Sequence, residues 1–83
     1  MKYKVGDKVK IKCLDWYNEN KDCYGDIECG VDYFFIEEMA IYCGKLLTIV
    51  EAFDGENEYD NIYFMEGNVY KWTEFMIECK VEE

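Results

Sequence analysis

Short apolar segments between glycine-containing turns constrain the fold of this chain more than any other feature. In residues 8–13, apolar side chains alternate with lysines, a period-two pattern that predicts a strand with one buried face. Residues 46–53, 59–66, 69–73 and 77–81 are predicted as further strands by their β-branched and aromatic content and flanking turns. Five short strands predict a mainly β protein.

One short helix is predicted at residues 36–43, where apolar residues recur at i, i+3, i+4 and i+7 and Gly44 follows as a terminator. Together, five strands and one helix predict a single small domain over residues 1–83, folded as a closed or nearly closed barrel. Closure would remove the open sheet edges that invite aggregation in an aromatic chain.

The connection formed by residues 14–35 has no clean period and contains several turn residues. It carries six acidic residues against Lys21 alone, and a short hairpin fits within it. Turn-rich connections of this length are uncommon in compact domains and are often functional.

The formal charge of -10 arises from 19 acidic residues and nine lysines, with no arginine or histidine. Residues 1–12 hold five lysines and one aspartate, a balance of +4, so residues 13–83 carry -14. Such a surface repels nucleic acids and anionic membranes and favours a protein partner with a basic surface. Alternatively, the charge only keeps an aromatic domain in solution.

The five cysteines are odd in number, and the first residues lack the apolar stretch of a signal peptide. Both features favour the cytoplasm and reduced thiols. Cys13, Cys43 and Cys79 fall on predicted apolar faces and are expected to fill the core.

No cofactor or metal is expected. The spacing of Cys23 and Cys29 is wider than that of usual zinc knuckles. A calcium loop that starts in the acidic run 54–60 would lack the glycine at its sixth position and the glutamate at its twelfth, which is Met65. The chain has no histidine and no serine, so the common general base and nucleophile sets cannot be built. We therefore expect a protein that is not an enzyme.

A family resemblance follows from the order of motifs. Near the start of the chain stands Val5-Gly6-Asp7-Lys8-Val9, and the predicted helix ends in Cys43-Gly44-Lys45. An apolar strand, a hairpin and an aromatic closing motif with Tyr70 and Trp72 follow. This order resembles the SH3-like barrel repeat of Mind-bomb-type proteins and small phage or prophage proteins of similar pattern. The resemblance implies a five-stranded SH3-like barrel and, from the eukaryotic members, peptide recognition.

Aromatic and acidic side chains in the connection are the candidate binding residues. In an SH3-like barrel, a long loop after the first strand flanks the ligand groove, where rings cradle an extended peptide and carboxylates select basic residues. The candidates are Trp16, Tyr17, Tyr24, Asp26, Glu28, Asp32 and Tyr33. In the alternative interpretation, the aromatic residues of this segment only pack beneath the loop.

The sequence thus favours a small acidic protein-binding module, which the phage-like resemblance suggests is encoded by a phage or mobile element and acts on a host protein. An acidic mimic of DNA that inhibits a nucleic-acid-binding protein is the second hypothesis. Direct nucleic-acid binding is the third, supported only by the lysines of residues 2–12. A homodimer is also compatible with exposed aromatic residues.

Overall fold

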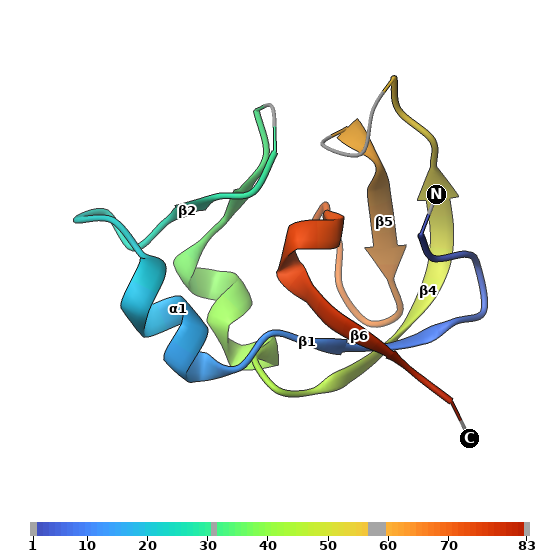
Figure 1. Ribbon diagram of the computed structural model, residues 1–83, viewed down its shortest axis with the longest axis horizontal. Helices are drawn as coiled ribbons and strands as arrows, with labels where there is room; N and C mark the ends of the chain where they lie inside the picture. Colours follow the sequence, from blue (N-terminus) through green and yellow to red (C-terminus); the bar gives the residue numbers. More distant parts are fainter. Residues whose placement is uncertain (1, 31, 57–59, 83) are drawn as a thin grey trace.

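A computed structural model describes residues 2–30, 32–56 and 60–82 and contains one four-stranded antiparallel sheet. The strands follow the order β5-β4-β1-β6, so the first and last strands of the chain are neighbours (Figure 1). Their bounds are Lys8–Ile11 for β1, Leu46–Phe53 for β4, Ile62–Met65 for β5 and Ile77–Val81 for β6. Alternation predicted the buried face of β1 correctly, since Val9 and Ile11 are buried. In β5 the alternating residues Tyr63 and Met65 form the buried face.

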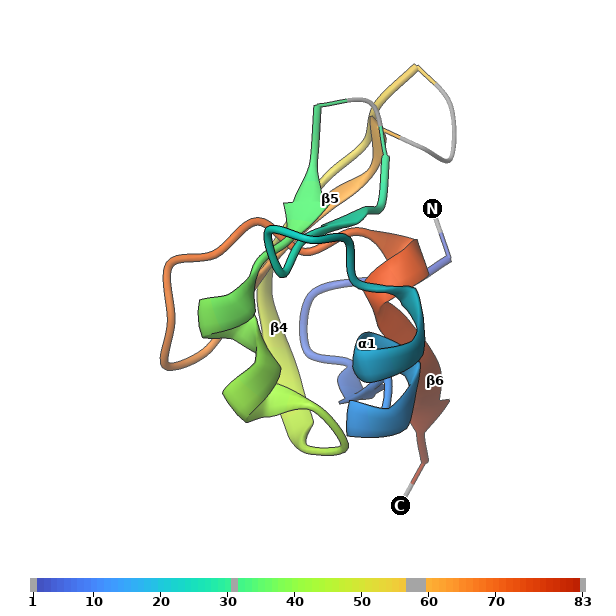
Figure 2. The same ribbon diagram turned by 90° about the vertical axis from the view of Figure 1, so that its left-hand side faces the viewer.

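A second layer is built by the chain between β1 and β4. It contains helix α1, a two-stranded hairpin of β2 and β3, and the 3-10 helix η1 (Figure 2). Their bounds are Leu14–Asn20, Ile27–Glu28, Phe34–Phe35 and Glu37–Tyr42. In Figure 1 this layer lies on one side of the molecule and the β4–β5 pair on the other.

The two layers share one hydrophobic core. Phe35 from the hairpin packs edge-on against Trp72 from the sheet side, with ring centroids 6.0 Å apart, and both side chains are fully buried. Met39 of η1 and Ile11 of β1 belong to the same cluster. The segment between β1 and β4 therefore forms one side of the core.

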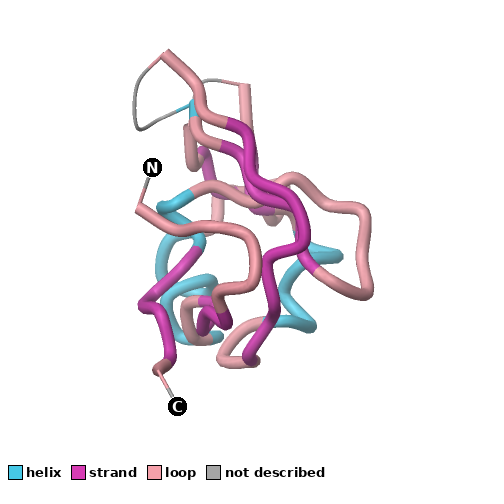
Figure 3. The backbone as a smooth tube through the Cα atoms, turned by 90° about the vertical axis from the view of Figure 1, so that its right-hand side faces the viewer, coloured by secondary structure: helices cyan, strands magenta, loops and turns pink. Residues whose placement is uncertain are grey.

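The sheets in the described part of the chain do not close into a barrel, which differs from the closed five-stranded arrangement expected from the sequence. Residues 69–73, predicted as a strand, form a loop that meets the sheet through one bridge between Tyr63 and Trp72. The amides of these two residues donate to each other's carbonyls, at 2.8 and 2.9 Å. The pairing stops there, whereas β4 and β5 continue as a long ribbon (Figure 3).

The predicted helix was confirmed in place, but the helix prediction was incomplete. The expected helix at 36–43 is the 3-10 helix η1, whereas the α-helix α1 lies in residues 14–35, where no helix was predicted. At seven residues, α1 is too short to be stable alone, so tertiary packing must hold it. The short hairpin compatible with this segment is present as β2 and β3.

The expected burial of Cys13 and Cys79 was also wrong, because both are exposed, and only Cys43 packs partly against the core. Strand β1 ends at Ile11, so Cys13 lies in the short connection to α1 rather than on the strand. Cys79 is exposed on β6, which forms an edge of its sheet. Cys29 is the buried cysteine instead. All five thiols are free.

Part of the predicted acidic turn at residues 54–60 lies outside the described residues, as does Tyr59 at the start of the predicted strand 59–66. No helix in the described ranges is long and apolar enough to cross a membrane.

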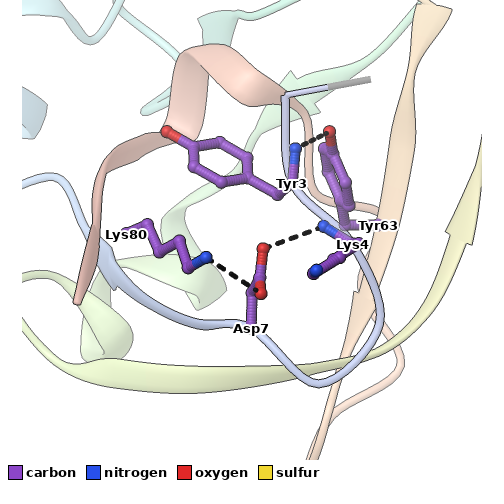
Figure 4. Close-up of polar contacts among 5 residues, drawn as sticks. All are labelled: Tyr3, Lys4, Asp7, Tyr63 and Lys80. Atoms are coloured by element: carbon purple, nitrogen blue, oxygen red, sulfur yellow. Dashed lines mark hydrogen bonds and ion pairs between the residues drawn. The ribbon is translucent and has the colours of Figure 1, made fainter. Parts of the chain in front are cut away.

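The amino-terminal segment lies against the sheet through a small polar network (Figure 4). The amide of Tyr3 donates to the Tyr63 hydroxyl at 3.2 Å, and the amide of Lys4 donates to the Asp7 carboxylate at 3.0 Å. The Lys80 ammonium lies 3.5 Å from the other Asp7 oxygen and so connects the first turn to β6.

Candidate functional site

Aromatic packing orders the segment between β1 and β4. The Trp16 ring meets Phe35 edge-on with centroids 5.1 Å apart, and the Tyr17 ring lies 5.5 Å from the same Phe35. The Tyr17 hydroxyl donates to the Gly25 carbonyl at 2.7 Å, so α1 is tied to the turn that follows it. Phe35 is therefore the centre on which α1 and the hairpin converge.

A groove of about 320 Å³ lies between α1, the β2 region and the 3-10 helix η3 (Glu74–Met76). It is lined by Lys12, Trp16, Asn20, Ile27, Glu28, Cys29, Gly30 and Phe75. Trp16 is half-buried and Phe75 is 37% exposed, so both rings present area to solvent. Two such rings in one groove suit an apolar or stacked ligand group.

The Trp16 ring already interacts with a cation. The Lys12 ammonium lies 5.4 Å from the ring centroid, within the range of a cation–π contact. Glu28 lies in the same groove with its side chain exposed to solvent. A positively charged group in the groove can thus contact both the face of the Trp16 ring and the Glu28 carboxylate.

The β2 wall of the groove is anchored to the opposite side of the core. The buried Thr73 hydroxyl donates to the Cys29 carbonyl at 2.6 Å, and the Cys29 amide donates to the Tyr33 carbonyl at 2.9 Å. Burial raises the pKa of the Cys29 thiol to about 11, so this cysteine is a packing group rather than a nucleophile.

A second network positions η3 and hence Phe75. The Glu74 carboxylate accepts hydrogen bonds from the Asn61 amide at 2.9 Å, the Tyr63 hydroxyl at 2.8 Å and the Lys2 backbone amide at 3.4 Å. Partial burial acts to raise the pKa of Glu74, but these hydrogen bonds outweigh it and lower the pKa. Burial and the bond to Glu74 raise the pKa of Tyr63.

The structure distributes the predicted binding residues over three grooves. Trp16 and Glu28 line the groove described above, whereas Tyr17 and Tyr24 line one of about 470 Å³ beside Glu37. Asp32 and Tyr33 line another of about 320 Å³ with Tyr70 and Lys71, where the Lys71 ammonium lies 6.0 Å from the Tyr33 ring. Asp26 lies in the turn before β2, with its amide bonded to Asp22.

Tyr17 is only 4% exposed, unlike Tyr24 at 81%. Burial raises the pKa of Tyr17, with Glu37 and Asp26 acting in the same direction. Substitution of Tyr17 would disturb the core, so it cannot serve as a binding test that leaves the fold intact. Trp16 is half-buried and is the better probe of the two, but its ring also packs on Phe35, so circular dichroism must show that a Trp16 variant keeps its fold before its binding is compared.

Sequence reasoning missed Phe75 and Lys12 as groove residues. Phe75 belongs to η3, a 3-10 helix of three residues, and an apolar ring in so short a segment between two predicted strands was the available signal. Lys12 was assigned to the lysine face of the first strand, although β1 ends one residue earlier.

A comparison with protein-family models, curated proteins and solved structures finds no match to this chain. Within residues 2–30, 32–56 and 60–82, no group of three or more Cys, Asp or Glu side chains is arranged to hold a metal ion. The groove described above offers aromatic rings and charged side chains.

Proposed function

We propose that this protein is a non-enzymatic binding domain with an SH3-like arrangement, and that the Trp16–Phe75 groove binds an extended, basic segment of a protein partner. The element order supports the SH3-like part. The first and last strands are neighbours, a long connection follows the first strand, and the Trp72 bridge takes the place of the missing strand.

The Lys12–Trp16 contact is the observation that carries the proposal. It shows a ring of the groove accepting an ammonium group from the protein itself at 5.4 Å. An arginine or lysine of a partner can replace Lys12 there, with Glu28 close enough to line the same groove. Phe75 offers apolar area for a neighbouring residue of the bound segment.

The acidic charge of residues 14–35, which supply most of the groove lining, favours a basic segment. Residues 14–35 carry six acids and one lysine, a balance of -5, and Asp15, Glu19, Asp22 and Glu28 are exposed. Such a field accelerates encounter with a positively charged partner and disfavours an acidic one.

The test uses an array of extended arginine-containing peptides and matched peptides with glutamate in place of arginine. Peptides that bind only in the arginine form are then titrated against variants. We expect Trp16→Ala to weaken binding at least about tenfold, because a central aromatic contact contributes more than about 1.4 kcal/mol. Lys12→Gln is expected to strengthen binding, since it removes a competitor for the Trp16 ring.

Tyr24→Ala is the matched control, because Tyr24 is an exposed ring outside this groove. Equal peptide affinity in Trp16→Ala, Phe75→Ala and the unchanged protein would show that the groove is not the binding site. If this protein instead mimics DNA, its affinity for a nucleic-acid-binding partner would fall steeply with salt and would not change in Trp16→Ala.

We also propose that the protein acts in the cytoplasm. All five cysteines, which lie within the described residues, are free, and a reducing compartment would preserve that state. Labelling of thiols in intact cells before and after reduction tests this proposal. Complete blocking of the thiols by disulfides in the cell would contradict it.

A further inference from the structure

Strand β6 forms an edge of the main sheet. It pairs antiparallel with β1, with Lys8 opposite Val81 and Lys10 opposite Cys79. No other strand in the described ranges lies along its second edge. Glu78, Cys79 and Lys80 at its centre are all exposed. An open strand edge is a template for pairing with another chain.

The sequence of β6 is complementary to itself in the antiparallel direction. When two copies pair about a two-fold axis through Cys79, Glu78 of one copy lies opposite Lys80 of the other, and Ile77 lies opposite Val81. This register is also the one that pairs all five residues of the strand. Shifting the axis to position 78 or 80 places like charges opposite each other, which is destabilising.

We infer that two copies of this chain associate through antiparallel pairing of their β6 strands, with Cys79 on the two-fold axis, to form a continuous sheet across the dimer. Cross-strand pairs of opposite charge lie on both sides of the axis. A parallel copy in register would place Glu78 beside Glu78 and Lys80 beside Lys80, so the charges specify the antiparallel arrangement.

The charged side chains of β6 are accessible to a second copy. Glu78 lies 3.8 Å from Lys10, and its side chain is 47% exposed, while Lys80 lies 3.5 Å from Asp7 and is 40% exposed (Figure 4). In the dimer each would lie between a charge of its own chain and one of the partner. The net charge of -10 on each chain opposes association. We therefore expect a dissociation constant between about 1 µM and about 1 mM.

Sedimentation over that concentration range tests the charge pairing. Glu78→Lys alone and Lys80→Glu alone should each be monomeric, because each places like charges opposite each other across the axis. An equimolar mixture of the two variants should recover dimers, because opposite charges then face each other in the heterodimer. Glu51→Lys is the control for Glu78→Lys, because it makes the same change of charge at an exposed position on β4, and it should not abolish dimers.

Chemical cross-linking tests the register without changing any charge. Directly opposite residues have Cβ atoms about 4.5–5.5 Å apart, within reach of the short thiol-reactive cross-linker bismaleimidoethane. A chain with Cys13→Ala and Cys23→Ala keeps Cys79 as its exposed thiol and should give covalent dimers. A chain with Cys23→Ala and Cys79→Ala keeps Cys13 exposed and should give no covalent dimers under the same conditions, because Cys13 lies away from the proposed two-fold axis.

Melting of each variant at low concentration separates loss of pairing from loss of the fold. A folded Glu78→Lys variant that dimerises as the unchanged protein does would overturn the inference. So would equal cross-linking through Cys13 and Cys79, or a protein that stays monomeric to about 1 mM.

Discussion

Replacing Phe35 by alanine tests whether the segment between β1 and β4 belongs to the core. The Phe35 ring is fully buried and meets the rings of Trp16, Tyr17 and Trp72 at centroid distances of 5.1, 5.5 and 6.0 Å. Removing a buried phenylalanine side chain costs about 3–5 kcal/mol. Three ring contacts place this site towards the upper end of that range.

The total stability sets the consequence of that loss. At about 0.05–0.15 kcal/mol per residue, a chain of 83 residues has a free energy of unfolding of about 4–12 kcal/mol. Phe35→Ala is therefore expected to remove a third or more of it. Phe35→Leu, which keeps most of the apolar volume, should cost less and serves as the matched control.

Urea unfolding followed by far-UV circular dichroism gives the free-energy difference, and the Cys29 thiol reports locally on the hairpin. If the segment detaches before the sheet unfolds, the Cys29 labelling rate will rise at urea concentrations that leave the sheet signal intact. A loss below about 1 kcal/mol for Phe35→Ala would refute the placement of this ring at the centre of the core.

Three further predictions follow from the polar contacts and thiols. Because the pKa of Glu74 is lowered in the folded state, its contribution to stability is complete above its ordinary value of 4.5 and is lost as pH falls through the lowered pKa. Glu74→Gln should therefore flatten the acid side of a melting-temperature profile, and an unaltered profile would contradict this. Thr73→Val leaves the Cys29 carbonyl without its donor and should cost about 1–3 kcal/mol in urea unfolding, whereas an unchanged midpoint would argue against that bond. At neutral pH, Cys29 should react with iodoacetamide at least about 100-fold more slowly than Cys13 and Cys23, as followed by mass spectrometry, and equal rates would be inconsistent with its burial.

Local sequence pattern was sufficient for the strands of the main sheet. Alternation in residues 8–11 and 62–65 determines which side chains face the core, because successive side chains of a strand point to opposite faces. The glycine after η1 likewise marked the end of a helical segment, and it adopts the positive φ that favours glycine.

Pattern failed where distant residues decide the outcome. Helix α1 has no side-chain cap and only seven residues, and it exists because Trp16 and Tyr17 pack on Phe35. No local spacing encodes that contact. Cys79 alternates as a core residue would, yet it is exposed on an edge strand.

The sequence by itself determined a mainly β chain with a strongly acidic surface and an aromatic connection, because composition and short-range periodicity act locally. Tertiary structure alone decided that Trp16, Glu28 and Phe75 line one groove and that the remaining candidate residues lie elsewhere. These residues are far apart along the chain, and only the packing of η3 and α1 around one core brings their side chains together.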